Sequence, residues 1–82
     1  HYFYFPADVK EFYWVSERDG NAHLYRYDYS GKLLSQVTKG PWEVVFVHNI
    51  DAKNKKVYYT STEASPLERQ LYVVDTDGKN KR

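Results

Sequence analysis

Hydrophobic and aromatic residues occur along this chain in short runs, separated by clusters rich in glycine, proline, asparagine and aspartate. Runs of this length, rich in tyrosine, valine and threonine, are typical of β-strands, and no window shows the 3.6-residue period of a helix. We therefore expect an all-β fold of antiparallel strands without helices. The predicted strands are Tyr2 to Phe5, Glu11 to Glu17, His23 to Asp28, Leu33 to Thr38, Glu43 to Asn49, Lys56 to Thr62 and Arg69 to Asp75.

One frame of residues occurs twice, as LYRYDYSGK at 24–32 and as LYVVDTDGK at 71–79, 47 positions later. The segments before the two frames also align if a residue or two is inserted in the second hairpin loop. In each turn the Asp can accept backbone hydrogen bonds, and the Gly supplies a positive φ at little steric cost. A period in the forties with about four strands per unit is typical of a β-propeller blade.

We therefore interpret residues 1–82 as a partial β-propeller. Residues from about 1 to 38 would end one blade, and residues from about 43 to 82 would form the next blade without its outer strand, which we expect to begin near Lys81. The segment EVVFVHNI at 43–50 is apolar on both faces at its centre, which predicts a strand buried on both sides. Open strand edges in such an incomplete blade predict self-association.

Composition narrows the possible functions. The net charge is +1, from 12 basic and 11 acidic residues, so no strong field would attract nucleic acid or an anionic membrane. The absence of cysteine excludes disulfides and cysteine-based zinc sites. The longest apolar run, Val44 to Val47, is far shorter than the roughly 20 residues of a membrane helix. Because the chain starts at His1 and has no methionine, we expect a processed product or an excised fragment.

The histidines His1, His23 and His48 lack the spacing of a metal site, so we predict no metal and no cofactor. His23 is expected to hydrogen-bond across its hairpin. The chain contains neither the Gly-x-Ser-x-Gly elbow of a serine hydrolase nor a Ser-x-x-Lys pair. We therefore expect no catalytic residues, and the sequence does not indicate which residues would bind a substrate.

Two further groups of residues have two interpretations each. The carboxylates of Glu17 and Asp19 could act as acid and base, but with Arg18 between them we favour a solvated turn held by a local ion pair. A set of aromatic side chains could stack against sugars or single-stranded nucleic acid, but no cluster of basic residues accompanies it, so we favour packing in the core and between blades. The set consists of Trp14, Tyr25, Tyr27, Tyr29, Trp42, Tyr58 and Tyr59.

The run EFYWVSERDGNAHLYRYDYSGKLLSQVTKGPWEVV, continued by VYYTSTEASPLERQLYVVDTDGK, resembles the N-terminal β-propeller of the dipeptidyl peptidase IV family, in the prolyl oligopeptidase superfamily. Bacterial members look more similar than animal ones. The resemblance implies a serine exopeptidase that removes an N-terminal dipeptide ending in proline or alanine. In that family the Ser-Asp-His triad lies in a C-terminal α/β-hydrolase domain, and a pair of propeller glutamates binds the substrate's amine. This chain has no Glu-Glu pair.

The resemblance implies that this segment is not catalytic by itself and that it gates substrates and supports the active site as a scaffold. Its partners would be the C-terminal α/β-hydrolase domain and peptide substrates, and the parent protein would be periplasmic or otherwise outside the cytoplasm. Two alternatives belong to other classes. One is a pair of blades from a non-enzymatic binding protein with a periplasmic or WD-type propeller, and the other is an aromatic carbohydrate-binding module.

Overall fold

The computed structural model describes residues 2–7 and 9–82. Within these residues the chain forms seven strands and one short 3₁₀ helix, and all strand pairs are antiparallel. The elements are β1 (Tyr2–Tyr4), β2 (Glu11–Ser16), β3 (His23–Asp28), β4 (Leu33–Gln36), β5 (Val44–Asp51), η1 (Ala52–Asn54), β6 (Lys56–Ser65) and β7 (Glu68–Asp75). The predicted all-β, antiparallel fold is confirmed, and each predicted strand is present with ends that differ by a few residues at most.

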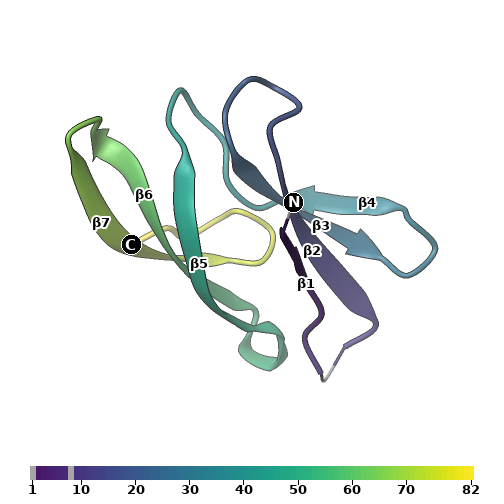
Figure 1. Cartoon of the computed structure of the whole chain (residues 1–82). Coiled ribbons are helices and arrows are strands. Elements are labelled where there is room, and N and C mark those ends of the chain that lie inside the picture. Colours follow the sequence, from purple (N-terminus) through teal and green to yellow (C-terminus); the bar gives the residue numbers. More distant parts are fainter. Residues whose placement is uncertain (1, 8) are drawn as a thin grey trace.

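The strands form two sheets, in the order β1-β2-β3-β4 and β5-β6-β7. Figure 1 shows the sheets next to each other, with the segment between β4 and β5 crossing from one to the other. Every hydrogen-bonded neighbour within a sheet is also the next strand along the chain, so each sheet is a simple meander. Among the described residues no helix is long and apolar enough to cross a membrane.

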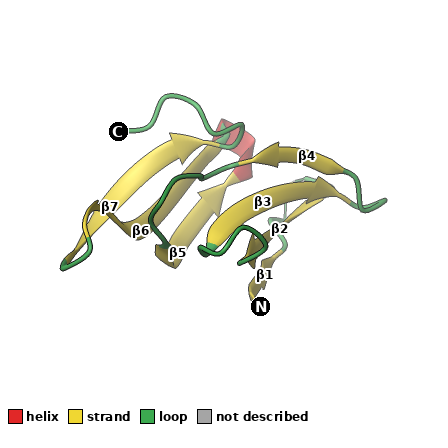
Figure 2. Ribbon diagram, turned by 90° about the horizontal axis from the view of Figure 1, so that it is seen from above, coloured by secondary structure: helices red, strands yellow, loops and turns green. Residues whose placement is uncertain are grey.

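The short helix η1 differs from the expectation of a chain without helices. It fills the connection between β5 and β6, at one end of the second sheet (Figure 2). The Asp51 carboxylate accepts a hydrogen bond from the Asn54 amide at 3.3 Å, and Lys55 then takes a left-handed φ of 59°. A single 3₁₀ turn is too short to produce a helical period in the sequence, which is why the pattern missed it.

The repeated frame is a repeated turn. In the first copy the Asp28 amide donates to the Lys32 carbonyl at 3.0 Å, and in the second the Asp75 amide donates to the Lys79 carbonyl at 2.9 Å. The glycine of each frame also donates its amide back to the aspartate carbonyl, at 3.1 Å from Gly31 and 2.8 Å from Gly78. Both glycines have a positive φ, near 90°, as the sequence predicted.

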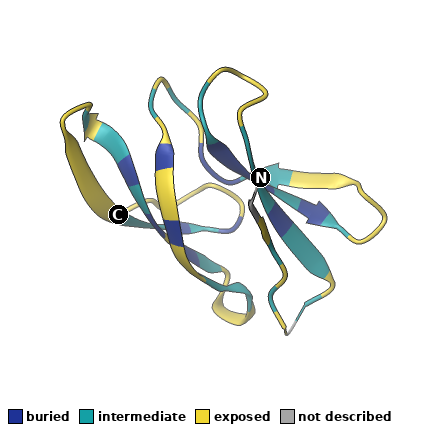
Figure 3. Ribbon diagram, in the orientation of Figure 1, coloured by how far each residue is buried: buried dark blue, intermediate teal, exposed yellow. Residues whose placement is uncertain are grey.

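The core lies where one face of each sheet packs against the other. Figure 3 shows the buried segments concentrated in the middle of the strands, while the hairpin tips are exposed. The first sheet contributes Tyr13 and Leu24, and the second contributes Val57, Tyr59 and Val74. Large apolar and aromatic groups in such positions supply most of the free energy that stabilises a small β-structure.

The expectation that the segment 43–50 is buried on both sides is wrong for this chain. Strand β5 is the edge of its sheet, and its burial alternates, with Val44 and Val47 buried and Val45 and Phe46 exposed by 42% and 58%. Two register shifts in its pairing with β6 rotate the side chains so that only one face meets the first sheet. The apolar run predicted that both faces of β5 would be covered, but the two sheets of this chain cover only the face that carries Val44 and Val47.

Two more features lie at the end of the second sheet. The predicted gap between the strand that ends at Thr62 and the strand that begins at Arg69 is shorter than expected, because β6 continues to Ser65 and only Pro66 and Leu67 separate it from β7. The segment after the second turn returns to β7, where Arg82 and Val73 exchange two backbone hydrogen bonds of 2.8 and 2.9 Å. Arg26 is the residue of the first repeat that corresponds to Val73, and in the first sheet it pairs with Ser35 of β4. The outer side of β7 is therefore paired at Val73.

Polar contacts fix the two sheets relative to each other at both ends of the core. At one end the Val44 amide donates to the Ala22 carbonyl at 2.8 Å. At the other end the Ser35 hydroxyl donates to the Thr76 carbonyl at 2.8 Å. Ser35 also accepts from Arg26, whose guanidinium binds both carboxylate oxygens of Glu11 at 3.0 and 3.1 Å. This chain of bonds ties three strands of the first sheet to the turn of the second.

Candidate functional site

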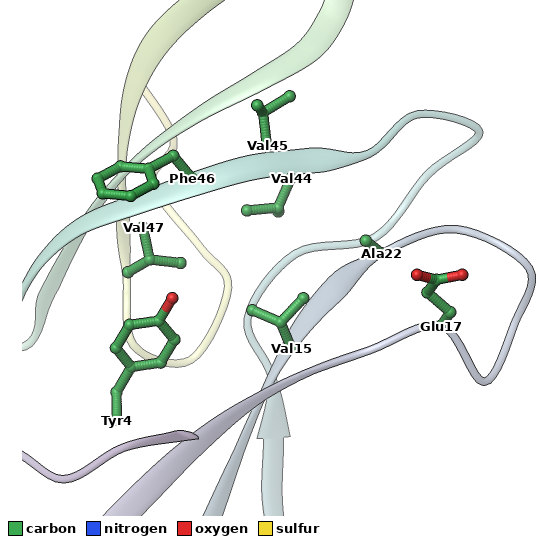
Figure 4. Close-up of a pocket in the computed structure, with 8 residues that line it drawn as sticks. All are labelled: Tyr4, Val15, Glu17, Ala22, Val44, Val45, Phe46 and Val47. Atoms are coloured by element: carbon green, nitrogen blue, oxygen red, sulfur yellow. The ribbon is translucent and has the colours of Figure 1, made fainter. Parts of the chain in front are cut away.

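A pocket of about 230 Å³ lies between the two sheets, beside their first strands (Figure 4). Its walls are mostly apolar. Figure 4 shows Val15 of β2 and Val44 and Val47 of β5 facing the space between the sheets. The complete lining consists of Tyr4, Val15, Glu17, Ala22, Val44, Val45, Phe46 and Val47.

Glu17 is the one residue of this lining with a charged side chain, and it extends from the hairpin after β2 to the rim of the pocket (Figure 4). The lining contains no histidine, serine, cysteine or lysine that could act as a nucleophile or base beside it. An apolar pocket with one carboxylate at its rim suits a small apolar group that carries a positive charge. It offers binding chemistry without reaction chemistry.

The hairpin that contains Glu17, Arg18 and Asp19 is solvated as expected, but the predicted ion pair is wrong. Among the described residues Arg18 pairs with neither neighbouring carboxylate; its guanidinium carbon lies 3.8 Å from the centroid of the Tyr25 ring. The guanidinium also donates to the Tyr27 hydroxyl, and the Tyr25 hydroxyl donates to Asp19 at 2.9 Å. Arg18 and Asp19 are therefore each held by tyrosine side chains of β3 and not by each other.

His23 is buried, but its partners are not those of the sequence prediction. Its Nδ1 lies 2.9 Å from the Thr38 hydroxyl and its Nε2 lies 2.9 Å from the Gly40 carbonyl, so it binds the segment after β4 rather than the opposite strand of its own hairpin. Its ring also packs edge-on against Trp42. With both ring nitrogens engaged, His23 is a structural link between the first sheet and the connection to the second.

The other two histidines do not form a site with it. His48 lies exposed on β5, where its Nε2 is 2.5 Å from the Thr60 hydroxyl and its ring touches Phe46. His1 is outside the described residues. Within the part of the chain that the structure describes, no group of three or more histidine, aspartate or glutamate side chains could hold a metal ion.

A polar cluster that the sequence analysis missed surrounds Glu63. Its carboxylate accepts hydrogen bonds from the Ser61 hydroxyl at 2.6 Å and the Tyr59 hydroxyl at 3.0 Å, and it forms an ion pair with Lys81. The Lys81 ammonium also lies 5.0 Å from the centroid of the Trp42 ring. Glu63 is the one acidic residue in the segment VYYTSTEAS, at 57–65, and that isolated charge was the available signal.

Two buried tyrosines, Tyr59 beside Glu63 and Tyr13 in the first sheet, are held in their neutral form. Burial raises the pKa of Tyr59 well above its usual range, and the hydrogen bond to the Glu63 carboxylate adds to that effect. Burial likewise raises the pKa of Tyr13 to about 12, and repulsion from Glu11 contributes. Phenols with raised pKa values are poor bases and nucleophiles near neutral pH, so these tyrosines serve as hydrogen-bond donors.

Most of the aromatic set packs within or between the sheets, in two groups. Tyr59 stacks between Trp42 and Tyr72 at the inner side of the second sheet. On the outer face of the first sheet, Trp14 and Tyr27 pack with three phenylalanines. Tyr25, paired with Trp14, is buried beneath Arg18, whereas Tyr29 and Tyr58 are more exposed and belong to neither group. This distribution supports packing rather than a platform for ligands.

Residues 1–82 match the family described as dipeptidyl peptidase IV (DPP IV) N-terminal region. The chain is 41% identical over 71 residues to "Dipeptidyl peptidase 4" of Trichophyton rubrum, and 41% identical over 70 residues to "Probable dipeptidyl peptidase 4" of Aspergillus flavus. These alignments cover 85% and 84% of this chain but only 9% of either relative.

A solved structure gives the same result. The chain superposes on the crystal structure of Porphyromonas gingivalis dipeptidyl peptidase 4 with a TM-score of 0.84 and 39% identity, over 98% of this chain and 11% of that one. This chain thus spans about a tenth of the proteins that it matches. The resemblance predicted from the sequence is confirmed, and the fold corresponds to part of the N-terminal propeller.

Proposed function

Because this chain belongs to the family of dipeptidyl peptidase IV N-terminal regions, we propose that it is a non-catalytic wall segment in the propeller of a serine-type dipeptidyl peptidase. In that enzyme it gates the active site, so that short or unfolded peptides enter, and it supports the groups that hold the peptide's N-terminus. The catalytic residues belong to a C-terminal α/β-hydrolase domain, which is its partner in the same protein. That protein acts outside the cytoplasm.

One observation carries this proposal: the two sheets are packed directly on each other and joined by hydrogen bonds at both ends of the core. A gate must keep its shape when a peptide presses against it, and binding groups must be held to within a fraction of an ångström. Buried large side chains such as Tyr13 and Leu24 leave little freedom for the sheets to move apart. The engaged His23 and the neutral Tyr59 are consistent with support rather than reaction.

The test uses the full-length parent peptidase. Leu24→Ala removes a buried side chain from the inter-sheet core, and Leu67→Ala, at an exposed hairpin tip, is the matched control. We expect Leu24→Ala to raise kcat/KM for a long or partly folded peptide relative to a chromogenic dipeptide-proline substrate, because a loosened wall discriminates less by size. Leu67→Ala should leave that ratio unchanged.

The same assay also tests whether this segment takes part in the reaction itself. The 82-residue chain alone should not cleave the dipeptide-proline substrate, and turnover by this chain would contradict a non-catalytic role. If Leu24→Ala lowered the melting temperature but left the ratio for the two substrates unchanged, the segment would stabilise the enzyme without gating it.

A further inference from the structure

The pocket between the two sheets has apolar walls that the fold itself holds in place. Figure 4 shows Tyr4 and Val15 of the first sheet on one side of the space and Val44 and Val47 of β5 on the other. Val44 and Val47 are each 6% exposed and belong to the core between the sheets. The Val44 amide also donates to the Ala22 carbonyl at 2.8 Å, which fixes β5 beside the first sheet. The pocket therefore needs no ligand in order to form.

The hairpin after β2 places one charge at the rim of this pocket. Glu17 follows Val15 by two positions, and Figure 4 shows both side chains on the side of the hairpin that faces the space. Arg18 lies on the opposite face of the sheet, where its guanidinium carbon is 3.8 Å from the centroid of the Tyr25 ring and its guanidinium donates to the Tyr27 hydroxyl. The cation next to Glu17 in the sequence is therefore directed away from the pocket.

The Glu17 carboxylate has no partner among the described residues, in which no hydrogen bond or ion pair involves it. The backbone around it is nevertheless ordered, since the Gly20 amide donates to the Glu17 carbonyl at 2.9 Å and the Ala22 amide donates to the Glu43 carboxylate at 3.2 Å. The lining of the pocket contains no basic side chain that would neutralise the charge. An unpaired carboxylate thus stands at the mouth of a preformed apolar space.

We propose that this pocket binds a small primary amine with an apolar body. The ammonium group donates to the Glu17 carboxylate, and the body lies between Val15, Val44 and Val47. An anion would be repelled by Glu17, and a neutral apolar molecule would gain nothing from it. A cavity of about 150 Å³ holds one benzene molecule, so this pocket of about 230 Å³ has room for a ring with a two-carbon chain.

The walls also separate a free amine from the N-terminus of a peptide. A peptide carries an amide next to its ammonium group, and an amide that is buried without a hydrogen-bond partner is destabilising. The valine side chains offer no such partner, and at the edge of the pocket the amide and the carbonyl of Ala22 are already engaged. We therefore expect amines without an amide to be preferred, and the site does not depend on how the propeller treats peptide substrates.

The experiment uses the full-length parent peptidase. Its active site is first filled with a dipeptide phosphonate that reacts with the catalytic serine, so that amines cannot bind there. Saturation-transfer NMR titrations then give the dissociation constants of phenethylamine, of the matching neutral alcohol phenylethanol, and of phenylalaninamide, which adds the amide of a peptide.

Three variants accompany the unmodified enzyme. Glu17→Gln removes the charge and keeps the size of the side chain, and Glu68→Gln makes the same change at an exposed position in the hairpin of the other sheet. Val15→Leu adds one methylene group at the wall of the pocket. It tests the location of the ligand independently of the charge.

We expect phenethylamine to bind the unmodified enzyme and Glu68→Gln equally, with a dissociation constant of roughly 1 mM for so small a compound. Glu17→Gln should raise this constant about tenfold, because a charge-assisted hydrogen bond is lost. Phenylethanol should bind Glu17→Gln and the unmodified enzyme alike. Val15→Leu should weaken both compounds, since it takes up space without changing the charge. Phenylalaninamide should bind the unmodified enzyme more weakly than phenethylamine does.

Other outcomes overturn the proposal. If Glu17→Gln binds phenethylamine as well as the unmodified enzyme does, the carboxylate does not hold the amine. If Val15→Leu changes neither affinity, the compounds bind elsewhere on the enzyme. Tighter binding of phenylalaninamide than of phenethylamine would assign the pocket to peptide N-termini. A lack of saturable binding by phenethylamine would show that the pocket takes no amine of this size.

Discussion

The imidazole of His23 shows how a single buried polar residue is kept in place in this molecule. Both of its nitrogens have partners on the segment that leads from the first sheet to the second. The Thr38 hydroxyl, in turn, accepts a hydrogen bond from the Leu24 amide at 3.0 Å. The described residues contain no buried side-chain nitrogen or oxygen without a hydrogen-bond partner, so such links account for the polar groups of the interior.

Replacing His23 by phenylalanine should therefore destabilise the fold. The ring would still fill its place against Trp42, but the Gly40 carbonyl and the Thr38 hydroxyl would lose a partner, at a cost of about 1–3 kcal/mol. Urea denaturation followed by tryptophan fluorescence measures the change. His48→Phe, on an exposed face, should change the free energy of unfolding by less than about 0.5 kcal/mol. Equal effects of the two substitutions would show that the His23 contacts add nothing.

The two turn aspartates predict a loss of stability in acid. The hydrogen bond from Ser30 lowers the pKa of Asp28, and the hydrogen bond from Lys56 lowers the pKa of Asp75, in each case below the ordinary value of 3.8. A lowered pKa in the folded state contributes stability above pH 3.8, and this contribution is lost as the pH falls further and the carboxylates become protonated. Asp28→Asn combined with Asp75→Asn should flatten the dependence of unfolding free energy on pH below 4.

Thermal melts at pH 3 and pH 6 check this prediction. The double variant should show a smaller difference in melting temperature between the two conditions than the unmodified chain. Glu17→Gln combined with Glu68→Gln, at two exposed positions, matches the change in net charge. An unchanged difference in the double variant would mean that acid destabilises the fold through other groups.

At the scale of elements, the two Asp-x-x-Gly turns are alike in backbone and unlike in surroundings. A Cβ atom added to Gly31 would meet no atom within 4 Å, whereas one added to Gly78 would lie 2.8 Å from the Gln36 carbonyl oxygen of the first sheet. The second turn is therefore also an inter-sheet contact. Its glycine is needed for its positive φ and for the close approach of two backbones.

Alanine substitutions at the two glycines separate these effects. Gly31→Ala should cost about 1–2 kcal/mol, because alanine at positive φ is strained. Gly78→Ala carries the same strain and, in addition, about 1–3 kcal/mol for pushing the turn away from Gln36. Denaturant unfolding of the two variants gives the difference directly. Equal costs would indicate that the second turn can shift without disturbing the first sheet.

The strands and turns of this chain could be predicted from its sequence because their signals are local. Alternating runs and the glycine turns depend on neighbours within a few residues, and the repeat showed that they recur. The partners of His23 and Arg18 and the edge position of β5 depend on contacts between distant segments. The cluster around Glu63 likewise forms only when Lys81 and Tyr59 meet across the second sheet. The isolated charge of Glu63 marks a position in the sequence, but its partners, like those of His23, are determined only when distant segments meet in the fold.

At the scale of the whole molecule, one interface holds the two sheets together, and its energy can be tested at equivalent positions. Leu24→Ala should lower the free energy of unfolding by about 2–5 kcal/mol, because it leaves a cavity in the inter-sheet core. Leu71→Ala changes the same residue type at the same place in the repeat, but on an exposed face, and should cost less than about 1 kcal/mol. Chemical denaturation at a concentration where the chain is monomeric measures both. Similar costs would contradict the unequal burial.

The β2-β3 and β6-β7 hairpins differ in length, whereas the two Asp-x-x-Gly turns have the same length. Six residues separate the paired positions Ser16 and His23 in the first sheet, and eight separate Ser61 and Gln70 in the second. The longer hairpin ends at the exposed Leu67, away from the core, whereas the second turn touches the first sheet at Gly78. Duplicated units of this kind can therefore diverge by insertion at the hairpin tip, while the turn keeps a fixed length in descendants that still fold.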